Sequence, residues 1–382
     1  MSATVFVTTV DISTNSGSGI ATREIVRSLG RVSDGPLIVL CPEPENDVPD
    51  RLKDHVDQFE FLPKVTDPGS PRWRLHVELI TLWKLGSLFR ETNISTVVTR
   101  LSQSTLFPAP LCNIFGAHHS LLVRGWVRRQ DEYGSTRFGR LVEQITRMNV
   151  RLSDSVFVAF DELRQWIEPY RSDSQTPIKV LPNAVDPNLF SPAPLAEARN
   201  SVGIEPEAFV VGFVGSLALR HEVSTLLDAA ATVDDVRVVI VGDGEIRSEL
   251  EKQVASLGIR DRVRFVGRVP HNQVPNYVAA FDACYGVVST TKSSNPIKCY
   301  EYLASERPVI TSASPEMQFI ENNDLGIVVD ELSADAVADA IQTLQNMTST
   351  QRAEIGSRGR AYIIKNHTWD AVARQILSTT PQ

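Results

Sequence analysis

The sequence predicts an α/β fold with two doubly wound parallel sheets. Short β-branched segments alternate with segments of helical periodicity from one end of the 382-residue chain to the other. Several expected strands are almost wholly apolar, such as Val236–Val241, as is typical of strands buried on both faces. The alternation stops in the proline-rich segment Pro182–Pro206 and then begins again. We therefore expect two domains, with ligands beyond the carboxyl ends of the strands.

The expected strands fall into two sets, one on each side of the proline-rich segment. In the first half they are Thr4–Val10, Leu37–Cys41, Thr96–Thr99, Leu111–Gly116, Ser155–Phe160 and Ile178–Leu181. In the second half they are Val210–Gly215, Val236–Gly242, Val263–Gly267, Ala283–Val288, Pro308–Thr311 and Ile327–Val329. Amphipathic helices are expected between them, for example over Gly19–Gly30 and Ile297–Ala304.

The domain boundary is expected at residue 182, with domains over 1–182 and 183–365. A last amphipathic helix follows the second sheet, with Trp369, Val372 and Ile376 on one side. Because the second sheet is already covered at that point, residues 366–382 are expected to cross back and pack on the first domain.

Composition excludes several classes of protein. The 38 Lys and Arg against 46 Asp and Glu give a net charge of −8, which argues against a nucleic-acid partner. No stretch reaches the ~18 apolar residues of a membrane-spanning helix. Cys41, Cys112, Cys284 and Cys299 stand far apart and show no ligand spacing, so we expect reduced thiols, no metal site and a cytoplasmic location.

A glycine-containing turn, Asn15–Gly19, follows the first expected strand and opens a helix. Gly17 and Gly19 would let the backbone approach a ligand, and the helix N-terminus would favour an anion. The alternative is a tight turn with no ligand.

Two further turns follow strands of the second half. In the first, Ser216, Arg220 and His221 stand near a helix start, where Arg220 and His221 could complement a phosphate or decorate a loop. In the second, Gly242 begins a Gly-Asp-Gly turn, which suits either a sharp bend or a close ligand.

The segment Thr291–Ala304 carries a cation and a carboxylate at a helix start. Pro296 suits the first turn, Lys298 lies within one turn of the end, and Glu301 lies three residues further on the same side. Such a pair could grip a phosphate and a ribose diol together. The alternative is an internal Lys298–Glu301 surface pair of little energetic weight.

Two adjacent histidines, His118 and His119, follow the expected strand Leu111–Gly116. A histidine at the carboxyl end of a strand would face the ligand site and could donate a hydrogen bond or move a proton. The alternative is a buried structural histidine.

Taken together, these motifs resemble the large GT-B glycosyltransferase group known as family 4. Residues Asn183–Pro192 match its linker pattern Asn-Gly-Val-Asp-x-x-x-Phe-x-Pro, with Ala184 in place of glycine. The resemblance implies two Rossmann-like domains that face a central cleft, and a retaining transfer of sugar from a nucleotide-sugar, such as a UDP- or GDP-sugar, to a hydroxyl acceptor. It implies no metal and no further cofactor.

The resemblance also implies roles for individual residues. Glu301 would bind the donor ribose, and Lys298 would lie near the diphosphate with the helix start at Asn295, Pro296 and Ile297. Gly17 and Gly19 would border the donor phosphate or the acceptor. His119, or His118 if the alignment shifts by one, would lie near the reacting sugar, and Arg268 would flank the base.

The sequence departs from the family pattern at three places. Ser293 stands where the first acid of Glu-x7-Glu would lie, and Ser216 and His221 replace the usual Arg and Lys. Glu306 stands where glycine is common. A non-catalytic subunit that binds nucleotide-sugars therefore remains an alternative, as does a GT-B-like sugar-nucleotide epimerase.

The acceptor is the least determined partner: a glycan, a lipid-linked sugar or a small molecule. Residues 121–151 hold seven arginines and three acidic residues, beside Leu121, Leu122, Val123 and Trp126. This composition fits docking on an anionic membrane, and equally a solvated helix face over a normal core.

Overall fold

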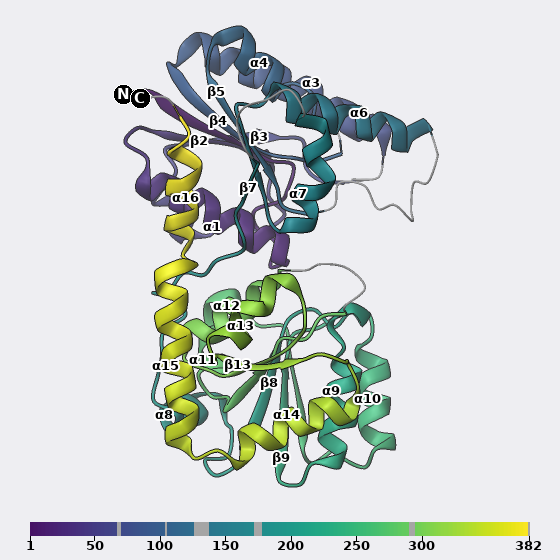
Figure 1. The fold of residues 1–382 in the computed structure, drawn as a ribbon. Helices are drawn as coiled ribbons and strands as arrows, with labels where there is room; N and C mark the ends of the chain where they lie inside the picture. The colour runs from purple at the N-terminus through teal and green to yellow at the C-terminus, as the bar shows by residue number, and fades with distance from the viewer. Residues whose placement is uncertain (67–69, 104, 126–136, 172–177, 290–294, 381–382) are drawn as a thin grey trace. The chain divides into compact units, whose positions relative to one another are not determined.

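The computed structural model describes residues 1–66, 70–103, 105–125, 137–171, 178–289 and 295–380 (Figure 1). The chain divides into two compact units. The first unit contains Met1–Pro182 together with Trp369–Gln382, and the second contains Asn183–Thr368.

The first unit is built on a parallel sheet with the strand order β3-β2-β1-β4-β5-β6-β7. Its strands are β1 (Ala3–Val7), β2 (Leu37–Pro42), β3 (Gln58–Leu62), β4 (Ile94–Arg100), β5 (His118–Val123), β6 (Ser155–Val158) and β7 (Ile178–Val180). Its helices are α1 (Gly17–Val32), α2 (Asp50–Lys53), α3 (Pro71–Glu91), α4 (Pro108–Phe115), α6 (Arg137–Leu152), α7 (Asp161–Ile167), the short η1 (Glu168–Arg171) and α16 (Trp369–Leu377).

Helices cover both faces of the first sheet. On one face, α3 packs through Val77, Leu85 and Leu88 against strands β1, β2 and β4. Figure 1 shows α3, α4 and α6 on this side and α1 and α16 on the other. Strands β1 and β2 are buried along their whole length, which explains their apolar sequences.

The second unit repeats this architecture, with the strand order β10-β9-β8-β11-β12-β13. Its strands are β8 (Phe209–Val214), β9 (Val236–Val241), β10 (Val263–Gly267), β11 (Ala283–Tyr285), β12 (Val309–Ser312) and β13 (Gly326–Val329). Its helices are α8 (Leu195–Val202), η2 (Leu219–His221), α9 (Val223–Thr232), α10 (Arg247–Ser256), η3 (His271–Gln273), α11 (Val274–Val278), α12 (Ile297–Ala304), η4 (Pro315–Met317), α13 (Gln318–Asn322), α14 (Ala334–Asn346) and α15 (Ser349–Asn366).

Two apolar clusters sandwich the second sheet. One gathers the inner faces of α9, α10 and α14, with Leu226, Leu250 and Ile341 among its members. The other gathers α11, α12, α13 and α15. Helix α12 is buried from Lys298 to Ala304, so even its charged side chains are removed from solvent.

The predicted crossover of the last helix is confirmed. Helix α16 packs against α1, with Val372, Ala373 and Ile376 buried. Arg31 Nη2 lies 3.3 Å from Asp370 Oδ2 and links the two helices. The last helix therefore completes the first unit.

The expected strand over Leu111–Gly116 is wrong. This segment lies in helix α4, which begins at Pro108 and ends at Phe115, and Gly116 with φ 72° forms its left-handed C-cap. The strand begins after it, at His118. Strand β3, at the edge of the sheet, was not expected.

Candidate functional site

The second sheet changes winding direction between β8 and β11, and several expected site residues lie beyond this point. Gly215 follows β8, and Gly242 follows the neighbouring β9. Gly242 has φ 136°, and a Cβ there would lie 1.9 Å from Gly215 O. A Cβ at Gly215 would lie 2.8 Å from Lys298 Nζ. The two glycines therefore allow two loops and a lysine side chain to meet.

Lys298 places a buried amine beside the two loops that follow β8 and β9. It is 9% exposed, its Nζ lies 4.0 Å from the Phe213 ring centroid, and this Nζ has no hydrogen-bond partner among the described residues. The pKa of Lys298 is lowered to about 7, chiefly by burial and also by Arg220, against the opposing effects of Cys299 and Glu301. A buried ammonium without a hydrogen-bond acceptor is positioned to receive an anion.

The turn after Gly215 brings together three of the expected residues. His221 Nδ1 donates to Ser216 O over 2.6 Å, and Ser216 and Arg220 are exposed. Burial, and to a smaller extent nearby Lys298, lower the pKa of His221 to about 3, so the imidazole is neutral at pH 7. His221 therefore donates a hydrogen bond within the turn, and the cations of this site are Arg220 and the protonated Lys298.

Glu301 is 6% exposed and its carboxylate has a partner that the sequence did not suggest. His271 Nε2 lies 3.1 Å from Glu301 Oε1, and because a carboxylate only accepts, His271 donates. His271 comes from η3, after β10, and its ring centroid lies 5.6 Å from that of Phe190 in the linker. Thirty residues separate the pair, so only the fold reveals it.

The start of α12 is fixed by the linker. Asn183 Nδ2 donates to Asn295 O, and Pro296 is the N-cap residue before Ile297. Arg268 is exposed directly after β10. Ser293 lies outside the described residues.

In the first unit, the turn with Gly17 and Gly19 lies where the sheet changes direction between β1 and β4. Ser16 Oγ accepts from Gly19 N over 3.0 Å and caps α1. A Cβ at Gly19 would lie 2.5 Å from Thr14 O, whereas a Cβ at Gly17 would meet nothing within 4 Å. Gly19 is thus required by close packing and Gly17 is not.

Arg100 supports the same turn from the carboxyl end of β4. Its Nη1 donates to Ser18 O over 3.0 Å and its Nη2 donates to Ser18 Oγ over 2.8 Å. Burial lowers the pKa of Arg100 to about 10. Arg100 was not expected from the sequence, where its one signal is its position as the first charged residue after an apolar strand.

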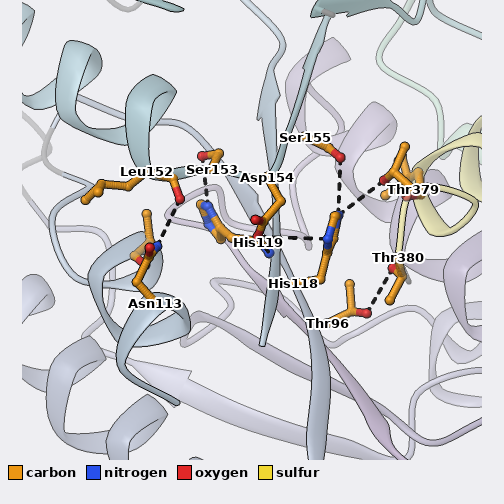
Figure 2. Close-up of polar contacts among 12 residues, drawn as sticks. Thr96, Asn113, His118, His119, Leu152, Ser153, Asp154, Ser155, Thr379 and Thr380 are labelled. Carbon is orange, nitrogen blue, oxygen red and sulfur yellow. Dashed lines mark hydrogen bonds and ion pairs between the residues drawn. The ribbon is translucent and has the colours of Figure 1, made fainter. Parts of the chain in front are cut away.

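The prediction that His118 and His119 lie at the carboxyl end of a strand is wrong. They begin β5 (Figure 2), so they lie at the amino edge of the parallel sheet, whereas the glycine turn follows the carboxyl end of β1. His119 is fully buried: its Nδ1 lies 2.9 Å from Ser153 Oγ and its Nε2 lies 2.9 Å from Thr99 Oγ1. Burial lowers the pKa of His119 to about 3. Both ring nitrogens have structural partners. The position of His119 therefore no longer supports a catalytic role.

His118 instead contacts the end of the chain. Its Nε2 lies 3.2 Å from Ser155 Oγ and 3.3 Å from Thr379 Oγ1, as Figure 2 shows. Thr96 Oγ1 lies 3.1 Å from Thr380 Oγ1 beside it. These contacts give His118 a role in holding the segment that follows α16.

The membrane interpretation of residues 121–151 also needs correction. Leu121, Leu122 and Val123 are at most 1% exposed within β5, so they cannot enter a bilayer. Trp126 lies outside the described residues. From residue 139 onward, where the side chains of α6 are described, the exposed apolar side chain is Leu141, which is 54% exposed.

Two features of the described residues concern membranes and metal ions. None of the helices described is both long enough and apolar enough to cross a bilayer. In the same part of the chain, no cluster of three or more His, Cys, Asp or Glu side chains is placed to hold a metal ion.

Comparison with known proteins gives consistent matches. Residues 196–362 match the family described as glycosyl transferases group 1. A 2-deoxystreptamine glucosyltransferase of Streptomyces kanamyceticus is 30% identical over 149 residues, 37% of this chain and 38% of that protein. A GDP-mannose-dependent alpha-(1-6)-phosphatidylinositol monomannoside mannosyltransferase of Mycobacterium tuberculosis is 30% identical over 217 residues, 52% and 54% of the two chains. The matches thus span less than two thirds of either relative.

The solved structure of HepE from Anabaena in complex with UDP is similar in fold along the whole chain. It has a TM-score of 0.77 and 18% identity, and the match covers 99% of both chains. At this identity the likeness concerns the fold alone.

Proposed function

We propose that the chain is a group 1 glycosyltransferase of GT-B fold, and that it moves a sugar from a nucleotide-sugar to a hydroxyl acceptor with retention at the anomeric carbon. In this reaction the bond from the anomeric carbon to the diphosphate oxygen breaks, and a bond to the acceptor oxygen forms. We propose that the second unit binds the donor and the first unit binds the acceptor.

The observation that carries the proposal is the buried amine of Lys298 beside Gly215, for which the described part of the chain supplies no hydrogen-bond partner. A diphosphate placed there would accept a hydrogen bond from the ammonium, and exposed Arg220 lies on the adjoining turn. As the leaving group gains charge, a fixed cation in a buried site stabilises it more than water would. Lys298 and backbone amides would therefore serve where other transferases use a metal ion, and we propose that no metal is required.

Glu301 is proposed to bind the donor ribose. One carboxylate oxygen accepts from His271, which leaves Oε2 to accept from a ribose hydroxyl. Arg268 is proposed to flank the base, and Ser293 to hydrogen-bond the sugar.

A nucleoside diphosphate sugar is proposed as the donor class. One relative is described as GDP-mannose-dependent, and the HepE structure contains UDP, which supports both UDP- and GDP-sugars as candidates. For the acceptor we propose a hydroxyl of a glycan, a lipid-linked sugar or a small molecule. The four buried free cysteines support a reducing, cytoplasmic compartment.

The proposal is tested by binding and turnover together. Calorimetric titrations with UDP and GDP would identify the base, and release of the nucleotide from UDP-glucose and GDP-mannose would report activity. Lys298→Met is expected to weaken nucleotide binding about tenfold or more, because charge-assisted hydrogen bonds contribute about 1.5–3 kcal/mol. Lys252→Met, at an exposed position of α10, is the matched control. Equal nucleotide affinity for the two variants would contradict the proposed site.

A second candidate is a non-catalytic subunit that binds nucleotide-sugars. The burial of His119 favours it, because the side chain expected near the reacting sugar is removed from solvent and both of its ring nitrogens are hydrogen-bonded within the first unit. Tight nucleotide binding without donor hydrolysis or transfer, across both donors, would support this candidate over the enzyme.

A further inference from the structure

Helix α3 carries an exposed apolar row that the fold does not use. Leu75, Leu79 and Trp83 are 57%, 51% and 66% exposed. They are four residues apart, so they lie on one side of the helix. The opposite side supplies Val77, Leu85 and Leu88 to the core, so the helix is apolar on both sides.

Basic residues accompany this row. Arg72 and Arg90 are exposed, and their helical positions place them at the two ends of the same side. His76 is exposed beside Leu75 and Leu79. We call Arg72, Leu75, His76, Leu79, Trp83 and Arg90 the outer face of α3.

The acidic residues of α3 lie away from the outer face. Glu78 is 3% exposed, and it accepts a hydrogen bond from Leu106 N over 2.8 Å. Glu91 is the last residue of the helix and accepts from Ser87 Oγ. Lys84 lies on another side, where its Nζ is 2.5 Å from Glu60 Oε2. The outer face thus presents cations and apolar groups without a carboxylate.

The apolar surface continues from α3 onto the end of α4. The Phe115 ring stacks on Phe89, with centroids 4.7 Å apart and planes 3° apart. Ile114 and Phe115 are 75% and 43% exposed. Figure 1 shows α3 and α4 next to one another on the outside of the first unit. Two helices therefore share one exposed apolar area.

We propose that the outer face of α3 docks on an anionic lipid bilayer, lying in the plane of the interface. Leucine and tryptophan side chains would enter the boundary between headgroups and acyl chains, and Arg72 and Arg90 would contact lipid phosphates. Charge complementarity favours this partner. The chain has a net charge of −8, yet the outer face of α3 carries arginines and no carboxylate. Each cation near an anionic bilayer adds about 1 kcal/mol of attraction. The proposal replaces the membrane contact expected from residues 121–151 and does not depend on the proposed donor site.

The test measures sedimentation of the full chain with vesicles. Phosphatidylcholine vesicles with and without phosphatidylglycerol are compared at low and high salt. The wild-type chain is expected to bind the mixed vesicles, with an affinity that falls as salt rises. Leu79→Gln with Trp83→Gln is expected to reduce binding at least tenfold, and Arg72→Gln with Arg90→Gln to weaken it and flatten the salt dependence.

Matched variants separate docking from general surface effects. Ile364→Gln changes another exposed apolar side chain, 45% exposed on α15, and Arg260→Gln changes an exposed arginine of the second unit. Both are expected to bind like the wild type. The proposal is overturned if the wild type stays in the supernatant with every vesicle, or if the α3 variants bind equally well. It is also overturned if sedimentation velocity shows self-association that the Leu79 and Trp83 substitutions abolish in the absence of lipid binding. Nucleotide affinity is expected to be unchanged in all these variants, which keeps this test separate from that of the donor site.

Discussion

His271 and Glu301 form a buried hydrogen-bonded pair across two elements of the second unit. Their Nε2 and Oε1 atoms are 3.1 Å apart, with side chains 14% and 8% exposed. Phe190, which is 1% exposed, packs beside the imidazole. The linker aromatic therefore positions the histidine, and the histidine fixes which carboxylate oxygen of Glu301 remains available.

Glu301→Ala is expected to weaken nucleotide affinity about tenfold or more, because a ribose hydroxyl would lose a charged acceptor. Glu249→Ala, on exposed α10, is the control and should leave affinity unchanged. Calorimetry with UDP and GDP measures both. An unaltered dissociation constant for Glu301→Ala would rule out the ribose role.

His271→Ala is expected to raise the donor KM several-fold with a smaller change in kcat, since the histidine positions a binding group. His271→Gln retains a donor and should recover part of the loss. If the two variants have the same KM, the histidine does not act through its hydrogen bond.

Nucleotide affinity is expected to fall as pH rises above about 7. In the protein without nucleotide, the pKa of Lys298 is lowered to about 7. A diphosphate binds the protonated form of Lys298, so binding is accompanied by uptake of a proton by the lysine. The dissociation constant should rise up to about tenfold per pH unit until the pKa of the complex is reached. Titrations in buffers of different ionisation enthalpy would detect the proton. Lys298→Met should show a flat profile over the same range, and a wild-type profile as flat would exclude this linkage.

His119→Ala is expected to destabilise the first unit by about 3 kcal/mol, because the change leaves a cavity, removes the acceptor of the Thr99 hydroxyl and removes a donor to Ser153 Oγ. Ser153 Oγ donates to Asn149 O, so His119 Nδ1–H donates to Ser153 and Nε2 accepts from Thr99. Turnover per folded molecule should be unchanged. Urea unfolding measures the first effect, and a specific loss of turnover in folded protein would restore the catalytic interpretation.

Because His119 is buried as a neutral imidazole, the stability of the first unit is expected to fall in acid. The pKa of His119 is lowered to about 3, so the unfolded chain binds the proton more readily. Its contribution to stability is complete above pH 6.5 and is lost as pH falls, by about 1.4 kcal/mol per pH unit towards pH 3. His119→Gln should reduce this slope in urea unfolding measured at successive pH values. An identical slope would show that another group controls the transition.

Gly19→Ala and Gly17→Ala form a matched pair. The first places a Cβ 2.5 Å from a backbone carbonyl oxygen, that of Thr14, and is expected to cost about 1–3 kcal/mol. The second places a Cβ in open space and should change stability by less than about 0.5 kcal/mol. Thermal unfolding compares them, and equal losses would show that the close packing of Gly19 is not limiting.

The alternation of strands and helices was sufficient to predict the fold class, because buried parallel strands leave a clear apolar pattern. It failed at Leu111–Gly116, since a short apolar run suits a helix or a strand equally well. That one error moved His118 and His119 to the wrong edge of the sheet. Strand β3 was missed because an edge strand such as Gln58–Leu62 is only partly buried.

The candidate site was predicted where chemistry is local in sequence. Lys298 and Glu301 share one turn of α12, and the glycine turns can be recognised directly in the sequence. His271 and Arg100 were not found, because their contacts join segments 30 and 82 residues apart. Only the positions of neighbouring strands bring such residues together.

The return of α16 to α1 has a consequence for biosynthesis. Residues 1–182 emerge from the ribosome long before Val372 and Ile376. The side of α1 that α16 covers therefore stays exposed to solvent while the 186 intervening residues are synthesised. The second unit, an uninterrupted segment, can finish folding first. The earliest part of the chain to be synthesised is thus the last to reach its final packing.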